Sequence, residues 1–148
     1  MMTMTATITG IDIDGTQTPG IANDNLVAAH IHAGPNDPNV TTNPVRWGFF
    51  GSPDNDVAPT DQLVITPAAS GAGGTFTSIW DAAEGNGAGI NLANQIPFIL
   101  AGNAYINFHT MQFTGGEIRG TLVVPAPGTI ALLGLGLFAL IGLRRKFA

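Results

Sequence analysis

The sequence predicts an all-β domain, built as an antiparallel sandwich or barrel and followed by one short C-terminal hydrophobic helix. Short segments with alternating apolar and polar residues recur along the chain, which is typical of strands that bury one face. Twenty glycines and ten prolines supply turns between such strands. The length of 148 residues allows one domain of ordinary size and one additional segment. We therefore expect a β domain over residues 1–123 and a separate segment over residues 124–148.

The predicted strands follow one another at short intervals. The first, over residues 5–14, alternates but changes face at Gly10. Residues 90–100 lack a strand pattern, and we expect a short helix or a turn there. The chain begins directly in strand-like sequence, without the basic and apolar regions of a signal peptide. We therefore expect that a signal peptide and the first strands are missing at the N-terminus. The other predicted strands cover residues 26–32, 45–50, 63–66, 75–80, 105–109 and 117–124.

Charge is distributed unevenly along the chain. Residues 1–123 contain all ten acidic residues but only two basic ones, Arg46 and Arg119, so their net charge is −8. Such an acidic domain is not expected to bind nucleic acid, because that interaction needs a basic surface. The chain has no cysteine, so its stability must come from a packed core without disulfides.

The three histidines of the chain lie on the polar faces of two predicted strands. Side chains alternate along a strand, so His30 and His32 share one face, and His109 shares a face with Tyr105 and Asn107. If the two strands are neighbours, the histidines form one cluster. The apolar side chains on the opposite faces are Val27, Ala29 and Ile31 in the first strand and Ala104, Ile106 and Phe108 in the second.

This arrangement of histidines is compatible with a metal site. Two histidines separated by one residue place their imidazoles about 6–7 Å apart on one side of a strand, close enough to share an ion. A third histidine would complete a three-nitrogen site for zinc or copper. The alternative is that His30, His32 and His109 are hydrogen-bonded structural residues that hold the neighbouring loops.

A second group of polar residues has a simpler interpretation. Glu117 and Arg119 lie two positions apart on one strand face, near Asn107, and we expect a structural ion pair or a contact that holds a loop. The sequence contains no nucleophile motif of the form G-x-S-x-G, so we do not expect an enzyme.

The last residues of the chain differ from everything before them. Residues 130–143 are apolar or glycine, and Arg144, Arg145 and Lys146 follow directly. A helix of this length spans about 21 Å, which is less than the roughly 30 Å of a bilayer core. The basic residues favour retention of this end at the cytoplasmic face of the inner membrane. The pattern indicates a processed sorting signal, and the alternative is a single permanent anchor.

This segment resembles the PEP-CTERM signal of Gram-negative bacteria. Pro125, Ala126, Pro127 and Gly128 correspond to its Pro-Glu-Pro triplet and the residue that follows, and the apolar run and the basic cluster correspond to the rest. Ala126 stands where the family usually has glutamate. The resemblance implies recognition by an exosortase, anchoring in the inner membrane through residues 130–143, and export to the cell surface or beyond.

Three blocks upstream resemble the CHRD domain, named for chordin. They are residues 29–34 (AHIHAG), 102–110 (GNAYINFHT) and 116–122 (GEIRGTL). The resemblance implies an immunoglobulin-like, Greek-key β fold in an extracellular protein, and the typical domain opens with an additional pair of strands. The first block is also similar to the copper-binding strand of Cu/Zn superoxide dismutase. Three histidines and no cysteine are too few for that enzyme's two metal sites and disulfide.

Three functions are compatible with these features. The first is a non-enzymatic surface or biofilm-matrix protein with a structural or binding role, associated with exopolysaccharide. The second is a zinc- or copper-binding domain that uses the three histidines. The third is self-assembly, in which an unpaired sheet edge accepts a strand from another copy, with residues 3–8 as the donor.

Overall fold

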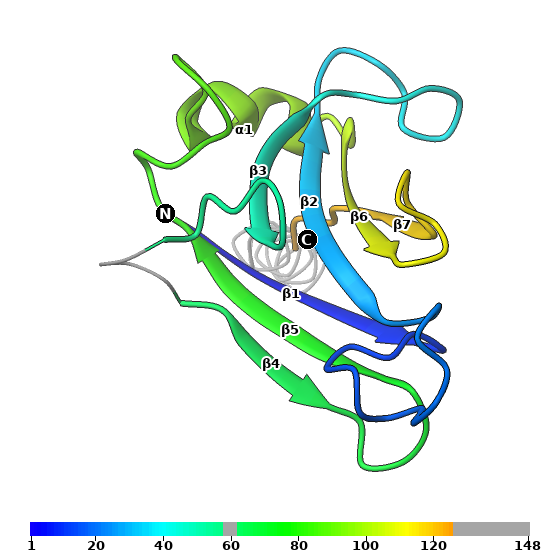
Figure 1. Ribbon diagram of the computed structural model, residues 1–148. Coiled ribbons are helices and arrows are strands. Elements are labelled where there is room, and N and C mark those ends of the chain that lie inside the picture. Colours follow the sequence, from blue (N-terminus) through cyan, green and yellow to red (C-terminus); the bar gives the residue numbers. More distant parts are fainter. Residues whose placement is uncertain (58–61, 126–148) are drawn as a thin grey trace, which may run out of the picture.

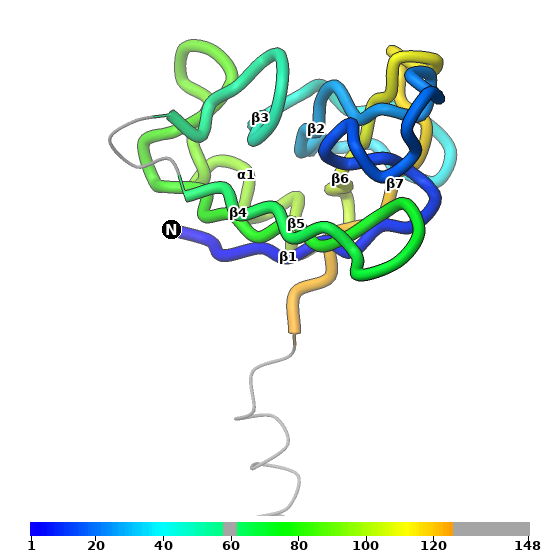
Figure 2. Tube along the Cα trace, turned by 60° about the horizontal axis from the view of Figure 1, so that its bottom comes forward, coloured from blue at the N-terminus to red at the C-terminus, as the bar shows by residue number. Residues whose placement is uncertain are grey.

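The structure, a computed structural model, describes residues 1–57 and 62–125, and it shows a sandwich of two antiparallel sheets (Figure 1). One sheet has the strand order β1-β5-β4, and the other has the order β3-β2-β6-β7. Figure 2 shows these sheets as two layers. The predicted fold class is therefore confirmed. The elements are β1 (Met2–Thr9), β2 (Leu26–Ala33), β3 (Val45–Phe50), β4 (Val64–Pro67), β5 (Gly73–Trp80), α1 (Leu92–Leu100), β6 (Ala104–Thr110) and β7 (Ile118–Thr121).

Five predicted strands are confirmed to within two residues at each end, whereas the first and the last are shorter than predicted. The prediction over residues 5–14 is wrong beyond Thr9, because Gly10 adopts a φ of +79° and turns the chain out of the sheet. Ile11 and Ile13 are nevertheless buried in the core. The last strand, β7, has four residues, half of the predicted length.

The predicted orientation of Val27 in β2 is also wrong. Val27 is 36% exposed, and Leu26 takes the position in the core instead. The pairing of β2 with β6 shifts its register between Leu26 and Ala28, which breaks the alternation at this point. Ala29 and Ile31 face the core as predicted.

The helix α1 confirms the expectation for residues 90–100. It begins after Asn91, whose side chain accepts a hydrogen bond of 3.1 Å from the backbone amide of Asn94 and so satisfies a free N–H of the first turn. Leu92 and Ile99 pack into the core. Among the described residues, no helix is both long and apolar enough to cross a membrane. The predicted C-terminal hydrophobic helix falls outside the described residues.

Aromatic side chains fill the space between the two sheets. Trp47 of β3 stacks on Trp80 of β5, with ring centroids 5.4 Å apart and planes 7° apart. Phe49 meets both Phe76 and Phe108 in edge-to-face geometry, at 6.2 and 6.4 Å. All five are at most 4% exposed. Large buried aromatic side chains of this kind supply much of the stability of a domain without disulfides.

Candidate metal centre

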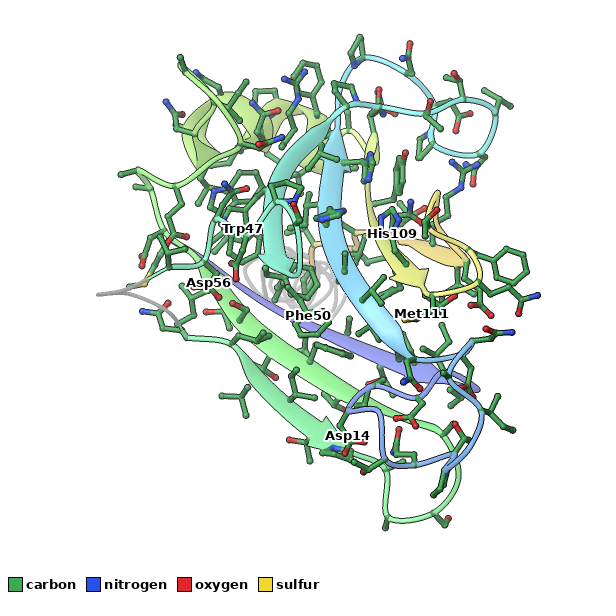
Figure 3. The ribbon with its side chains drawn as sticks, viewed as in Figure 1. Asp14, Trp47, Phe50, Asp56, His109 and Met111 are labelled. Carbon is green, nitrogen blue, oxygen red and sulfur yellow. The ribbon has the colours of Figure 1, made fainter. Side chains whose placement is uncertain are left out.

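The pairing of β2 with β6 brings the three histidines together on the outer face of their sheet. His30 lies opposite Asn107, and His109 lies opposite Ala28, so His109 is a diagonal neighbour of His30. Figure 3 shows His109 on β6, beside β2. His32 lies opposite Tyr105. The apolar side chains of both strands face the other way, into the core.

The distances between the histidines are those of a compact cluster. His30 Nδ1 lies 3.1 Å from His109 Nε2. One ring nitrogen from each of the three histidines can be chosen so that all lie within 4.8 Å of one another. Nitrogen ligands about 2.0–2.1 Å from a tetrahedral zinc ion lie about 3.4 Å apart, so small adjustments of the rings would accommodate an ion.

Two backbone carbonyls fix the orientation of the His32 and His109 rings. His32 Nδ1 donates to the carbonyl of Asn43 at 2.7 Å, and His109 Nδ1 donates to the carbonyl of Thr114 at 2.9 Å. In the neutral rings, these bonds leave both Nε2 atoms without a proton, so each has a lone pair that can accept a hydrogen bond or bind an ion. His32 Nε2 is buried and has no hydrogen-bond partner among the described residues. Histidine ligands of metals show this second hydrogen bond to a carbonyl.

The cluster is covered more deeply at His30 than at His32. His30 is 4% exposed, and His32 is only partly buried. The backbone of Gly48 on β3 and of Pro53 in the following loop packs against His30. A Cβ atom added to Gly48 would lie 1.8 Å from the Pro53 carbonyl oxygen and 2.9 Å from His30 Cδ2. Access from solvent is therefore through the His32 side.

Burial keeps two of the imidazoles neutral. It lowers the pKa of His30 to about 4, the charges of His109 and His32 act in the same direction, and the backbone of Ser52 opposes them. Burial also lowers the pKa of His32, against the effect of the Asn43 carbonyl. Neutral imidazole is the form that binds a metal ion, so neither ring needs to lose a proton at neutral pH.

Aromatic and cationic side chains support His32 from one side. The Tyr105 ring stacks on the His32 ring, with centroids 4.8 Å apart and planes 9° apart. The guanidinium carbon of Arg119 lies 5.2 Å from the centroid of Tyr105. The backbone amide of Asn43 donates to the Tyr105 hydroxyl at 3.4 Å. These contacts restrict the rotation of the His32 ring.

The predicted polar cluster of Asn107, Glu117 and Arg119 acts mainly on a loop. Glu117 accepts a hydrogen bond of 2.5 Å from the Thr110 hydroxyl, and Asn107 donates to the Gly115 carbonyl at 3.4 Å. Both contacts hold the turn between β6 and β7. Of the two interpretations, an ion pair or a loop contact, these contacts support the second, while Arg119 lies over Tyr105.

The sequence interpretation missed several residues that orient the cluster. Strand alternation places Tyr105 on the face of His109, but the stacking of Tyr105 on His32 depends on the pairing of β2 with β6. Asn43 and Thr114 come from loops, and a strand pattern carries no information about loop carbonyls. Of the predicted sorting-signal residues, Pro125 is the last described residue of the chain. Ala126, Pro127, Gly128, Arg144, Arg145 and Lys146 lie outside the described residues.

Comparison with known protein families identifies both parts of the chain. The family model described as CHRD domain matches residues 1–122, and the PEP-CTERM protein-sorting motif matches residues 123–146. The chain therefore belongs to the CHRD domain family. It is an exported protein sorted by an exosortase. Its sorting signal is anchored in the membrane, and the protein reaches the cell surface or extracellular space after this signal is processed. No curated protein and no solved structure matches the chain.

Proposed function

We propose that this exported CHRD domain has a binding role and that it holds one zinc or copper ion through His30, His32 and His109. The observation that carries the proposal is the convergence of three imidazoles whose ring nitrogens lie within 4.8 Å of one another. Imidazole nitrogen suits both zinc and copper, and three such ligands leave a fourth position for water or another ligand.

The surroundings of the histidines favour a metal site over a purely structural cluster. A structural cluster explains the contact in which His30 Nδ1 donates to His109 Nε2 at 3.1 Å, and it explains the bonds from His32 and His109 to the loop carbonyls of Asn43 and Thr114. It leaves His32 Nε2 buried with no hydrogen-bond partner in the described part of the chain, which is unfavourable for a polar atom. A metal ion would use this lone pair together with those of the other two rings.

Metal titration of the full chain tests the proposal. The detergent-solubilised protein would be stripped with a chelator and titrated with Zn²⁺ or Cu²⁺ by calorimetry, with the bound ions counted by native mass spectrometry. We expect one ion per chain. His32→Ala should lower the metal affinity by at least about 100-fold. Loss of a residue that only hydrogen-bonds to a metal ligand lowers the affinity by at most about this factor, and loss of a ligand should have a larger effect.

Thr7→Ala provides the control, because Thr7 is an exposed polar strand residue that lies on β1, in the other sheet, away from the three histidines. This variant should bind the metal with an affinity close to that of the original chain. Binding of much less than one ion per chain, or an unchanged affinity in His32→Ala, would contradict the proposal.

A further inference from the structure

An apolar groove of about 890 Å³ lies on the side of the sandwich bounded by β1, β7 and α1. Met4, Ile8 and Phe108 belong to both the core and its lining. Its edges are unusually apolar for a protein surface. Six of the large hydrophobic side chains that the described residues expose line this groove, namely Met1, Ile96, Leu100, Ile118, Val123 and Val124.

Charge distinguishes this groove from the rest of the domain. Among the described residues, Arg119 is the one charged residue that borders the groove, its guanidinium lies over Tyr105 on the outer face of the sheet, and no acidic residue of this part of the chain lines the groove. Residues 1–123 as a whole have a net charge of −8. The groove is therefore a surface that an anionic partner can approach without direct repulsion from carboxylates, whereas the other surfaces must carry the acidic residues.

The sorting signal begins at the edge of the groove, so the membrane that holds this signal lies near the groove. Pro125 lines its edge, and the apolar run begins five residues later at Ile130. Five residues span at most about 18 Å when fully extended. Figure 2 shows residues 122–125 leaving the body of the domain on the side of β1. When the apolar run is in the membrane, the groove must lie close to the lipid surface.

We propose that the groove docks on the surface of the bilayer that holds the sorting signal. The exposed apolar side chains at its edges, such as Leu100 and Ile96 on α1, enter the boundary between headgroups and acyl chains. The tether gives a high effective concentration, so even a weak intrinsic affinity keeps the groove on the lipid. Cleavage of the signal removes this tether and releases the domain.

Single cysteines provide a direct test, because the chain has no cysteine of its own. Leu100→Cys places a probe at the edge of the groove, at a position that is 66% exposed. Ile21→Cys is the matched control, since Ile21 is 57% exposed and lies in the loop between β1 and β2, outside the groove. Each full chain would carry an environment-sensitive fluorophore and be reconstituted into vesicles of phosphatidylethanolamine and phosphatidylglycerol.

The proposal predicts that lipids brominated on their acyl chains quench the Leu100→Cys probe several-fold more strongly than the Ile21→Cys probe. Aqueous iodide should show the reverse order. This protection should persist when the protein is diluted in lipid. Equal quenching of both probes would overturn the proposal. Protection that disappears on dilution in lipid would also overturn it, because a second copy of the chain would then occupy the groove.

Discussion

Burial of His30 makes the metal-free domain sensitive to mild acid. The pKa of His30 is lowered to about 4, from an ordinary value near 6.5. Between these values the unfolded chain binds a proton that the folded domain rejects, so stability falls as the pH falls. Each unit of pKa corresponds to about 1.4 kcal/mol, so the loss is of the order of 3 kcal/mol between about pH 7 and pH 4. Urea unfolding in the presence of a chelator would measure it.

The carboxylate of Asp12 loses its contribution to stability at lower pH than His30 does, so the effects of these two residues on stability can be separated by pH. Burial acts to raise the pKa of Asp12, but hydrogen bonds from the backbone of Thr18, Gln17, Asp14 and Gly15 together outweigh it and lower this pKa to about 2. Its contribution is complete above about pH 4 and is lost as the pH falls toward 2. An unfolding free energy that stays constant from pH 7 to pH 4 would contradict the prediction for His30.

Among the elements, β3 determines how closely the loop around Pro53 can pack over His30 in the candidate metal centre. Gly48 lies opposite His30 on the neighbouring strand, and its amide donates to the side chain of Asn55 at 2.9 Å. Gly48→Ala would force its Cβ into the backbone of Pro53, which cannot move as a flexible side chain would. We expect a destabilisation of about 1–3 kcal/mol. Chemical denaturation of the full chain in detergent would measure it.

Gly120→Ala is the control for this substitution, because nothing lies within 4 Å of the Cβ that it would add on β7. Its unfolding free energy should change by no more than about 0.5 kcal/mol. The displaced loop in Gly48→Ala should also expose His30 and raise its pKa toward the ordinary value, which NMR titration would detect. Equal stability of the two variants would show that the loop adapts without cost.

The sequence predicted the strands well because their signals are local. The alternation of side chains in β2 and β6 was sufficient to place the three histidines on the polar faces of these strands. The turn residues that follow each strand closely were sufficient to predict where the strands end. The register shift beside Val27 depends on pairing with another strand, so the chain itself shows no sign of it. The carbonyls of Asn43 and Thr114 that orient the rings depend on loop conformation. Neighbouring strands and loops, rather than local pattern, thus determine the geometry of the candidate centre.

The whole molecule divides its chemistry between an acidic β domain and a basic, apolar tail. Ten carboxylates and two arginines lie in residues 1–123, whereas residues 124–148 contain three bases and no acid. This division suits a protein whose domain is exported while its tail is held in the membrane. The three histidines of the proposed metal centre lie on the outer face of one sheet, and the groove lies between the sheets at β1 and β7, so the two proposed sites use different surfaces.

We expect that retention before processing depends on the three bases that follow the apolar run. Positive side chains resist transfer across the membrane and hold this end at the cytoplasmic face. Replacement of Arg144, Arg145 and Lys146 by glutamine should release uncleaved chain from the membrane. The variant would be expressed with a secretory signal peptide in a bacterium that has an exosortase, and the mass of the released protein would be measured. Phe147→Ala, which keeps all three bases, should be retained and cleaved normally. Identical membrane retention and identical cleavage products in the two variants would exclude this role for the basic cluster.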